Sequence, residues 1–324
     1  MATHPLAVLL CCAAALPGLL APPPLPELTC SEDGAEAAAD LAVRHVDEHH
    51  KHGFRFRLRE IQSSKYQQFP GGCHIDVNVK LTQTKCHFTD PEPLERCQPW
   101  RRNERGAVAT CSVEFWVMWG AAKITRHECA TRPEHTNDEL LTICPSCPKL
   151  LALDDPTGVS AVDAAVSKFN RDGRHQNYFT LLEVAQLTEG YVPAVGTVTW
   201  LKFALVETTC PRGATATFAA CTPRCPDRAN HVFCQTSYYN VHRQVGELSC
   251  QVYPPKVSGR QKRRRRLRPH GPSRVSAEFR RPPAGEPEPV CRPLFHKSAE
   301  ACVCKARLKE PDAAVHHICP FPLK

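Results

Sequence analysis

The spacing of the cysteines repeats within this chain of 324 residues, and the repeat constrains the fold more than any other feature. Two cysteines that are 11 positions apart are followed by two that are 18 apart, and the same order returns later with spacings of 11 and 16. The four positions recur at offsets of 124, 124, 123 and 121 residues: Cys86, Cys97, Cys111 and Cys129 correspond to Cys210, Cys221, Cys234 and Cys250. Such constancy indicates an internal duplication. Each unit, of about 120 residues, is long enough to bury its own core.

The hydrophobic periodicity predicts one helix followed by strands in each half. Apolar residues recur near a 3.6-residue period over 37–48 and again over 159–169, which is typical of amphipathic helices. Strict alternation follows at 54–58, 75–81 and 113–117, as in half-buried strands. The sequence around these strands also repeats: Phe54–Ile61 resembles Tyr178–Val184, and Val77–Cys86 resembles Leu201–Cys210. We therefore expect an α+β fold in which each half packs one helix on an antiparallel sheet.

The cysteine content indicates an oxidising compartment. The chain holds 19 Cys and 30 Pro, and a reduced cytosolic protein rarely carries so many thiols. Leu6–Leu20 is apolar and precedes Ala21 and a Pro-rich stretch, which is typical of a secretory signal peptide, although no Lys or Arg precedes it. We expect residues 1–21 to be that signal peptide and the protein to be secreted. A short N-terminal anchor is the alternative, but about 15 apolar residues are too few to span a bilayer.

The positive charge lies in the C-terminal part. Residues 253–324 hold 17 Lys+Arg and 6 Asp+Glu, whereas the rest of the chain holds 24 and 27. The body is therefore not expected to bind nucleic acid. The densest run, 260–268, predicts a convertase processing site or a heparin-binding patch, with a solvated linker as the third interpretation. The basic residues concerned are Arg260, Lys262, Arg263, Arg264, Arg265 and Arg266.

These features resemble the fetuin family of plasma proteins, which carry two cystatin domains and a long tail. The resemblance rests on the helix, strands and paired cysteines of each half, on the segment Cys144–Pro156 and on the helical text Ala164–Asn170, and it covers about residues 30–252. It implies two tandem cystatin-like domains, each with one helix on a twisted antiparallel sheet, and a largely disordered Pro/Arg-rich tail. The implied boundaries are a signal peptide at 1–21, a first domain at 22–143, a linker with the second domain at 144–252, and a tail at 253–324.

The resemblance also implies a set of disulfides. The implied pairs are Cys30–Cys319, Cys86–Cys97, Cys111–Cys129, Cys144–Cys147, Cys210–Cys221 and Cys234–Cys250. Cys73, Cys225, Cys291, Cys302 and Cys304 stay unassigned. Removal of the signal peptide leaves 17 cysteines, an odd number, so one thiol is free, or pairs between molecules, or the set departs from that of the family.

The first candidate site is a protease-binding wedge of the cystatin type. By resemblance, inhibitors of papain-like cysteine proteases insert two hairpins and an N-terminal segment into the active cleft. Gln68 and Gly72 match the first hairpin, with Pro70 in place of its central Val, and Trp119 matches the second. An ordinary turn with a surface Trp is the alternative. The second domain retains only Gly196 of this pattern, so we expect it to be inactive as a wedge.

The second candidate is the linker, which consists of Cys144, Pro145, Ser146, Cys147 and Pro148. The matching segment of some fetuins blocks astacin-type zinc proteases, with an Asp where this chain has Ser146. A neutral hydroxyl is a poor zinc ligand, which leaves inhibition of metalloproteases dependent on the rigid loop alone. A structural staple between the domains and a thioredoxin-like Cys-x-x-Cys centre are the alternatives, but no βαβ pattern surrounds the motif.

Two candidate cation sites are weaker in the sequence. The family's mineral-binding strand corresponds to residues 74–80, where Asp76 is the only carboxylate, so strong binding of calcium phosphate is not expected. His45 and His49 lie four positions apart on the first predicted helix and share a face, which suits a transition metal. A solvated polar face is the plainer interpretation, so we predict no metal site.

No nucleophile motif, phosphate loop or dinucleotide fingerprint occurs, so we predict no enzyme and no cofactor. The function predicted is a secreted protein that binds extracellular proteases, through either the first-domain wedge or the linker. A carrier of calcium phosphate or other ligands is one alternative, and a factor that binds heparan sulfate through the tail is another.

Overall fold

The structure, a computed structural model, describes residues 28–31, 34–101, 104–119, 121–213, 221–225 and 228–255. The predicted signal peptide, the basic run 260–268, all but the first three residues of the predicted tail, and Cys291, Cys302, Cys304 and Cys319 lie outside these residues. Within the described residues, no helix is long and apolar enough to cross a membrane.

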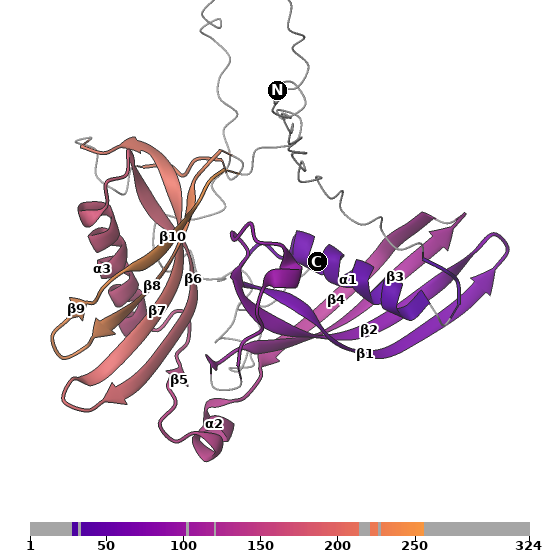
Figure 1. Cartoon of the computed structure of the whole chain (residues 1–324), viewed down its shortest axis with the longest axis horizontal. Coiled ribbons are helices and arrows are strands. Elements are labelled where there is room, and N and C mark those ends of the chain that lie inside the picture. Colours follow the sequence, from indigo (N-terminus) through magenta and orange to yellow (C-terminus); the bar gives the residue numbers. More distant parts are fainter. Residues whose placement is uncertain are drawn as a thin grey trace, which may run out of the picture.

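The first domain packs one helix on a four-stranded antiparallel sheet (Figure 1). The helix precedes the strands, and the strands follow one another in the sheet in the order β1-β2-β3-β4. The elements are α1 (Ala35–His49), β1 (Phe54–Phe69), β2 (Gly72–His87), the short 3₁₀ turn η2 (Leu94–Arg96), β3 (Ala107–Met118) and β4 (Ala121–Pro133). Alternate residues of β2 and β3 face α1, and Ile75, Val77 and Val79 are fully buried against it.

The second domain repeats this plan after a short connection. Its sheet has the order β10-β8-β7-β6-β5, with β9 paired to β8, and α3 packs on one face. The elements are α2 (Asn137–Ile143) and β5 (Lys149–Leu150) in the connection, then α3 (Pro156–Asp172), β6 (Asn177–Val192), β7 (Gly196–Pro211), β8 (His231–Tyr239), β9 (Gln244–Val245) and β10 (Ser249–Tyr253). Asp155 caps α3 by accepting from the Gly158 N–H, and Pro156 occupies the first turn, where its missing N–H costs nothing.

The two domains share irregularities as well as elements, which supports the duplication. The β1–β2 pairing shifts register between Phe54 and Phe56, and the β6–β7 pairing shifts between Asn177 and Phe179. An isolated bridge joins Thr84 to Pro99, and another joins Thr208 to Pro223. The α+β fold class predicted from the sequence, with two cystatin-like domains, is therefore confirmed for the described residues.

The disulfides agree with five of the implied pairs and correct the sixth. The structure joins Cys86–Cys97, Cys111–Cys129, Cys144–Cys147, Cys210–Cys221 and Cys234–Cys250. The implied Cys30–Cys319 bond is wrong, because Cys30 is bonded to Cys73 with their Cα atoms 5.8 Å apart. The reason is that Leu28 and Cys73 are both buried in the core of the first domain, and Cys30 packs against that core beside the start of β2. Every cysteine among the described residues, including Cys225, is disulfide-bonded.

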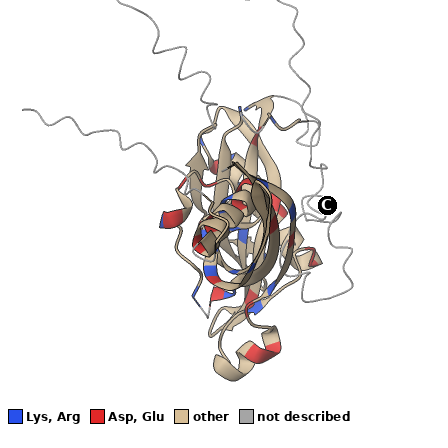
Figure 2. Ribbon diagram, turned by 90° about the vertical axis from the view of Figure 1, so that its right-hand side faces the viewer, with Lys and Arg blue, Asp and Glu red and all other residues tan. Residues whose placement is uncertain are grey.

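The domains meet where β1 begins and β2 ends, next to the C-terminal end of α1. His87 contacts Glu183 there, and Phe233 of β8 stacks on the His87 ring with centroids 4.9 Å apart. Leu182 and Val206 of the second domain cluster with Phe88 of the first. Figure 2 shows acidic and basic residues interspersed along the described ribbon.

Candidate functional site

Three segments of the first domain converge at the hairpin ends of its strands. The β1–β2 turn and the β3–β4 turn lie side by side, since Gly72 pairs with Met118 and the Trp119 N–H donates to the Gly71 carbonyl at 3.3 Å. The Cys30–Cys73 disulfide adds the N-terminal segment 28–31 to the same end. The structure therefore brings Gln68, Gly72 and Trp119, the residues of the predicted wedge, to one edge. Gly120, which follows Trp119 in the second turn, lies outside the described residues.

The second turn presents an aromatic tip. Trp119 has a positive φ of 53° and is 84% exposed. One edge of its ring lies over Gly71. Met118 and Trp116 next to it are also exposed, and the Trp116 ring packs edge-on against Phe69 at 5.7 Å. Large side chains held out into solvent in this way carry apolar area that only a partner can bury.

Close packing between the two hairpins requires a glycine at position 72. A Cβ at this position would lie 2.0 Å from the Val117 carbonyl oxygen, so no side chain fits between the two hairpins. Gly71 beside it has a φ of +86°, a conformation that other residues adopt at a cost. These glycines let the first turn approach the second closely, so the tips of the two turns lie side by side.

Gln68 is exposed, but its side chain also holds the N-terminal segment. Its Nε2 donates to the Cys30 carbonyl at 3.1 Å. The segment is thus held by a side-chain hydrogen bond and by the disulfide to Cys73. The signal for this second tether was present in the sequence as the unassigned Cys73, but its partner could not be deduced from spacing.

The linker forms a separate exposed loop. Thr136 and Glu139 form a capping box that starts α2, and Asn137 brackets the segment by donating to the Leu150 carbonyl at 3.0 Å and accepting from the Leu150 N–H at 2.9 Å. The Cys144–Cys147 disulfide closes a smaller ring inside that bracket, with Ser146 exposed at its tip. The loop is therefore closed twice, by the Asn137–Leu150 hydrogen bonds and by the disulfide inside them.

Apolar side chains flank this loop. Leu141 and Ile143 of α2 are exposed just before the disulfide, and Tyr191 is exposed at the end of β6. β5 holds the other side of the loop against the second domain, since Lys149 pairs with Glu189. Figure 1 shows α2 beside the hairpin end of the second domain, and Figure 2 shows the acidic first turn of α2 at that extremity of the molecule.

The wedge and the linker lie at opposite ends of the first domain. β2 runs 16 residues from Gly72 at the wedge to His87 at the domain contact, a span of about 50 Å. β4 ends at Pro133, paired with Ala107 at the start of β3, so the chain leaves the first domain far from the wedge. A single globular protease would therefore engage one site or the other.

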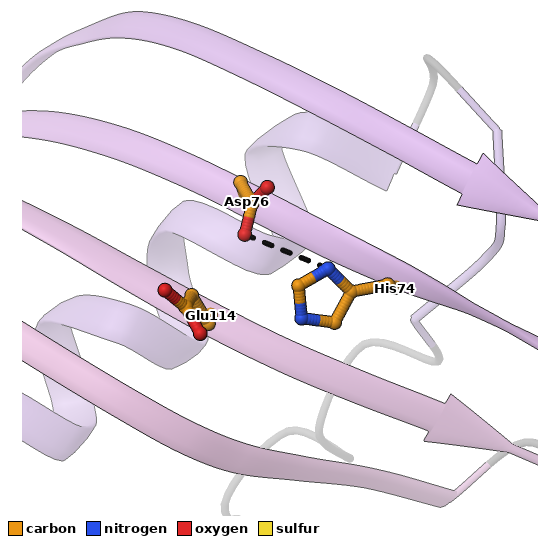
Figure 3. Close-up of side chains that lie close together, drawn as sticks. All are labelled: His74, Asp76 and Glu114. Atoms are coloured by element: carbon orange, nitrogen blue, oxygen red, sulfur yellow. Dashed lines mark ion pairs between the residues drawn. The ribbon is translucent and has the colours of Figure 1, made fainter.

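A group that could hold a cation lies on the outer face of the first sheet (Figure 3). His74 and Asp76 of β2 and Glu114 of β3 offer ligand atoms within 4.8 Å of one another, and His74 Nδ1 lies 3.7 Å from Asp76 Oδ1. The sequence analysis missed Glu114 because its proximity depends on strand register. Arg126 Nη1 lies 3.7 Å from Glu114 Oε1, and Lys65 lies opposite Asp76 on the neighbouring strand β1, so basic residues lie near both carboxylates.

The histidine run separates into two environments. His45 and His49 lie on one face of α1 with ring centroids 4.0 Å apart, and His127 of β4 joins them. Burial, together with the neighbouring His49 and His127, lowers the pKa of His45 to about 4. His50 and His52 instead turn into the interior and are buried.

Comparisons with known proteins agree with this architecture. Residues 146–243 match the family model described as cystatin domain. Alpha-2-HS-glycoprotein of Oryctolagus cuniculus is 27% identical over 230 residues, which are 70% of this chain and 62% of that protein. Antihemorrhagic factor cHLP-B of Gloydius brevicauda is 29% identical over 219 residues, 67% of this chain and 62% of that protein. The chain thus spans about 62% of the length of these curated relatives.

Solved structures give the same result for the fold. Mouse fetuin-B in complex with crayfish astacin superimposes with a TM-score of 0.52 at 16% identity, covering 69% of this chain and 71% of that one. Mouse fetuin-B in its inhibitory complex with human meprin beta gives a TM-score of 0.50 at 18% identity, covering 69% and 72%.

Proposed function

The chain belongs to the fetuin family, with tandem cystatin-like domains, and from this premise we propose that it is a secreted inhibitor of extracellular endopeptidases. The observation that carries the proposal is the convergence of segment 28–31 and two hairpin tips at one edge, with Trp119 84% exposed. The chain acts by binding, and its main target class is the papain-like cysteine proteases.

The wedge acts by filling an active cleft. Two tight turns with small residues approach the cleft floor, and the Trp119 ring supplies apolar area that is buried only in the complex. Burial of one such aromatic side chain commonly dominates the affinity of an interface. Pro70 at the first tip stiffens that turn but replaces the central Val of the cystatin pattern, so the second tip carries more of the contact.

Preorganisation supports the proposal. The Cys30–Cys73 disulfide, the Gln68 side chain and the contact between Trp119 and Gly71 hold all three parts in place before binding. A binding surface that is already ordered loses little conformational entropy in the complex, which leaves more of the contact energy as affinity.

The linker supports a second target class, the astacin-type zinc proteases. The observation in favour is the doubly closed loop at 137–150, with an exposed Ser146 and flanking apolar side chains. Fetuin-B has been solved in complexes with astacin and with meprin beta. In this chain the loop acts by occupying the cleft, because the Ser146 hydroxyl supplies no charged ligand to the zinc.

The test is a titration of the purified mature protein against a papain-like cysteine protease and an astacin-type protease. We expect inhibition of the first to fall at least about tenfold in Trp119→Ala, as for a central aromatic contact. The matched control is Tyr191→Ala, a similarly exposed aromatic at the hairpin end of the second domain, which should leave inhibition of the cysteine protease unchanged. Absence of inhibition of both enzymes at micromolar protein would refute the proposal. An equal loss of cysteine-protease inhibition in the two variants would show that the inhibitory site is not the wedge.

Binding of calcium phosphate and of heparan sulfate remain predictions. The structure adds the Glu114 carboxylate beside Asp76, but Arg126 lies 3.7 Å from Glu114, and the basic residue Lys65 lies opposite Asp76 on β1. The basic run assigned to heparan sulfate lies outside the described residues.

A further inference from the structure

Three imidazoles from two elements of the first domain come together beside α1. His45 and His49 lie one turn apart on the helix, and His127 comes from β4, the edge strand of the sheet. His127 pairs with Val113, whose side chain is buried in the core beneath α1. Because directly opposed residues on adjacent strands share a face, His127 points to the helix side of the sheet.

The edge strand is fixed at this point. Cys129, two residues from His127 and on the same face, is bonded to Cys111 of β3. The disulfide holds β4 in register, so the position of His127 relative to α1 does not depend on the weak pairing of an edge strand. The cluster is thus part of the fold rather than an encounter of mobile side chains.

Two of the ring nitrogens already have the spacing of metal ligands. His45 Nε2 and His127 Nδ1 lie 3.2 Å apart, with their rings at 78°. Two nitrogens that bind one tetrahedral Zn²⁺ at about 2.0–2.1 Å lie about 3.3 Å from each other. Without metal, the two nitrogens share one hydrogen; an ion takes its place when each ring carries its hydrogen on the other nitrogen.

His49 completes the set. Its Nδ1–H donates to the His45 carbonyl at 2.7 Å, which leaves Nε2 with its lone pair in the neutral ring. The His49 ring centroid lies 4.0 Å from that of His45 and 6.1 Å from that of His127. His49 is exposed and is the last residue of α1, so its ring is free to turn toward the other two nitrogens, and in doing so it gives up the hydrogen bond to the His45 carbonyl.

We propose that His45, His49 and His127 form a binding site for a divalent transition-metal ion, with Zn²⁺ as its ligand and water in the fourth position. Three imidazoles without a carboxylate favour Zn²⁺, Ni²⁺ or Cu²⁺ over Ca²⁺. The site is distinct from the His74–Asp76–Glu114 group, which lies on the opposite face of the sheet and contains two carboxylates. Bound metal would join α1 to the edge strand.

The experiment is a Zn²⁺ titration of the full-length secreted protein with intact disulfides, after treatment with EDTA, in competition with a chromophoric chelator. The chain holds 16 His, so the readout is the loss of one tightly bound equivalent rather than total zinc. We expect His45→Gln and His127→Gln to lose that equivalent and His74→Gln to keep it. Millimolar Ca²⁺ should not displace it.

His49→Gln keeps the proposal falsifiable if a half-buried variant fails to fold. Substitution of this exposed residue leaves the core unchanged, and we expect Zn²⁺ to bind at least about tenfold more weakly. The proposal is overturned if the wild type holds no equivalent at micromolar Zn²⁺, or if His127→Gln retains it while His74→Gln loses it.

Discussion

His87 and Glu183, 96 positions apart in the chain, join the two domains through a buried hydrogen bond. His87 Nε2 lies 2.5 Å from Glu183 Oε1, and the two side chains are 0% and 5% exposed. The same carboxylate oxygen accepts from the Gly53 N–H at 2.6 Å. One glutamate of the second domain therefore satisfies two donors of the first, inside a contact that Phe233 closes.

We expect Glu183→Ala to destabilise the domain contact by about 3 kcal/mol, because removal of one partner leaves buried donors without an acceptor. Chemical denaturation followed by two probes, one in each domain, checks this prediction. The control is Glu128→Ala, which breaks an exposed pair with Arg126 and should cost under about 1 kcal/mol. Equal effects of the two variants would mean that the domains are not coupled through Glu183.

Lys202 gives the protein a measurable pH dependence in the alkaline range. Its Nζ lies 3.9 Å from the centre of the Trp100 ring and donates to Gln186 Oε1 at 2.9 Å. Burial lowers the pKa of Lys202 from 10.5 to about 8; Glu104 opposes this change and Lys85 adds to it. Between these two pKa values the unfolded chain binds the proton and the folded chain does not, so stability rises with pH over this range.

The expected gain is about 1 kcal/mol of unfolding free energy between pH 7.5 and 9.5, because the cation–π contact offsets part of the desolvation. Denaturation at several pH values checks it, with Lys202→Met as the variant that should lose the slope. The pH range of the experiment ends at 9.5 so that Tyr253 does not titrate within it, because burial and Asp90 raise the pKa of that side chain. A slope unchanged in Lys202→Met would contradict the assignment.

The Cys30–Cys73 disulfide can be tested directly. Mass spectrometry of a non-reducing proteolytic digest should recover a peptide that contains this bond, and a Cys30–Cys319 peptide would contradict the structure. The bond closes a loop over a separation of 43 residues, and the paired variant Cys30→Ser with Cys73→Ser should lose about 4 kcal/mol in the chain-entropy model. Protease inhibition should weaken in the same variant, since segment 28–31 loses its tether.

Ser146→Asp tests the linker. The substitution places a carboxylate at the exposed tip of the Cys144–Cys147 loop, where it could bind the zinc of an astacin-type protease. We expect inhibition of that protease to increase at least about tenfold, with no change for a papain-like enzyme. The control is Ser146→Asn, which is similar in size but uncharged. No gain in the Asp variant would show that the loop does not reach the zinc.

Much of the architecture could be predicted because it is local or repeated. The helices at 35–49 and 156–172 follow from apolar periodicity, and they extend one or more residues beyond the predicted ranges at each end, as caps and flanking residues join them. β4 was not predicted, because an edge strand with one exposed face shows little alternation of apolar residues. Because β4 was not predicted, the proximity of its residue His127 to His45 and His49 was not predicted either.

The sequence by itself determined the duplication, the α+β class, five disulfide pairs by family resemblance, and the residues Gln68, Gly72 and Trp119 as candidates, because each leaves a mark in spacing or residue type. Only the tertiary structure decided what meets across strands and domains: Cys30 with Cys73, Glu114 with Asp76, His127 with His45 and Glu183 with His87. These pairs depend on strand register and on the packing of helix and domains, which place residues 38 to 96 positions apart in contact. Such contacts cannot be predicted from the spacing of residues along the chain.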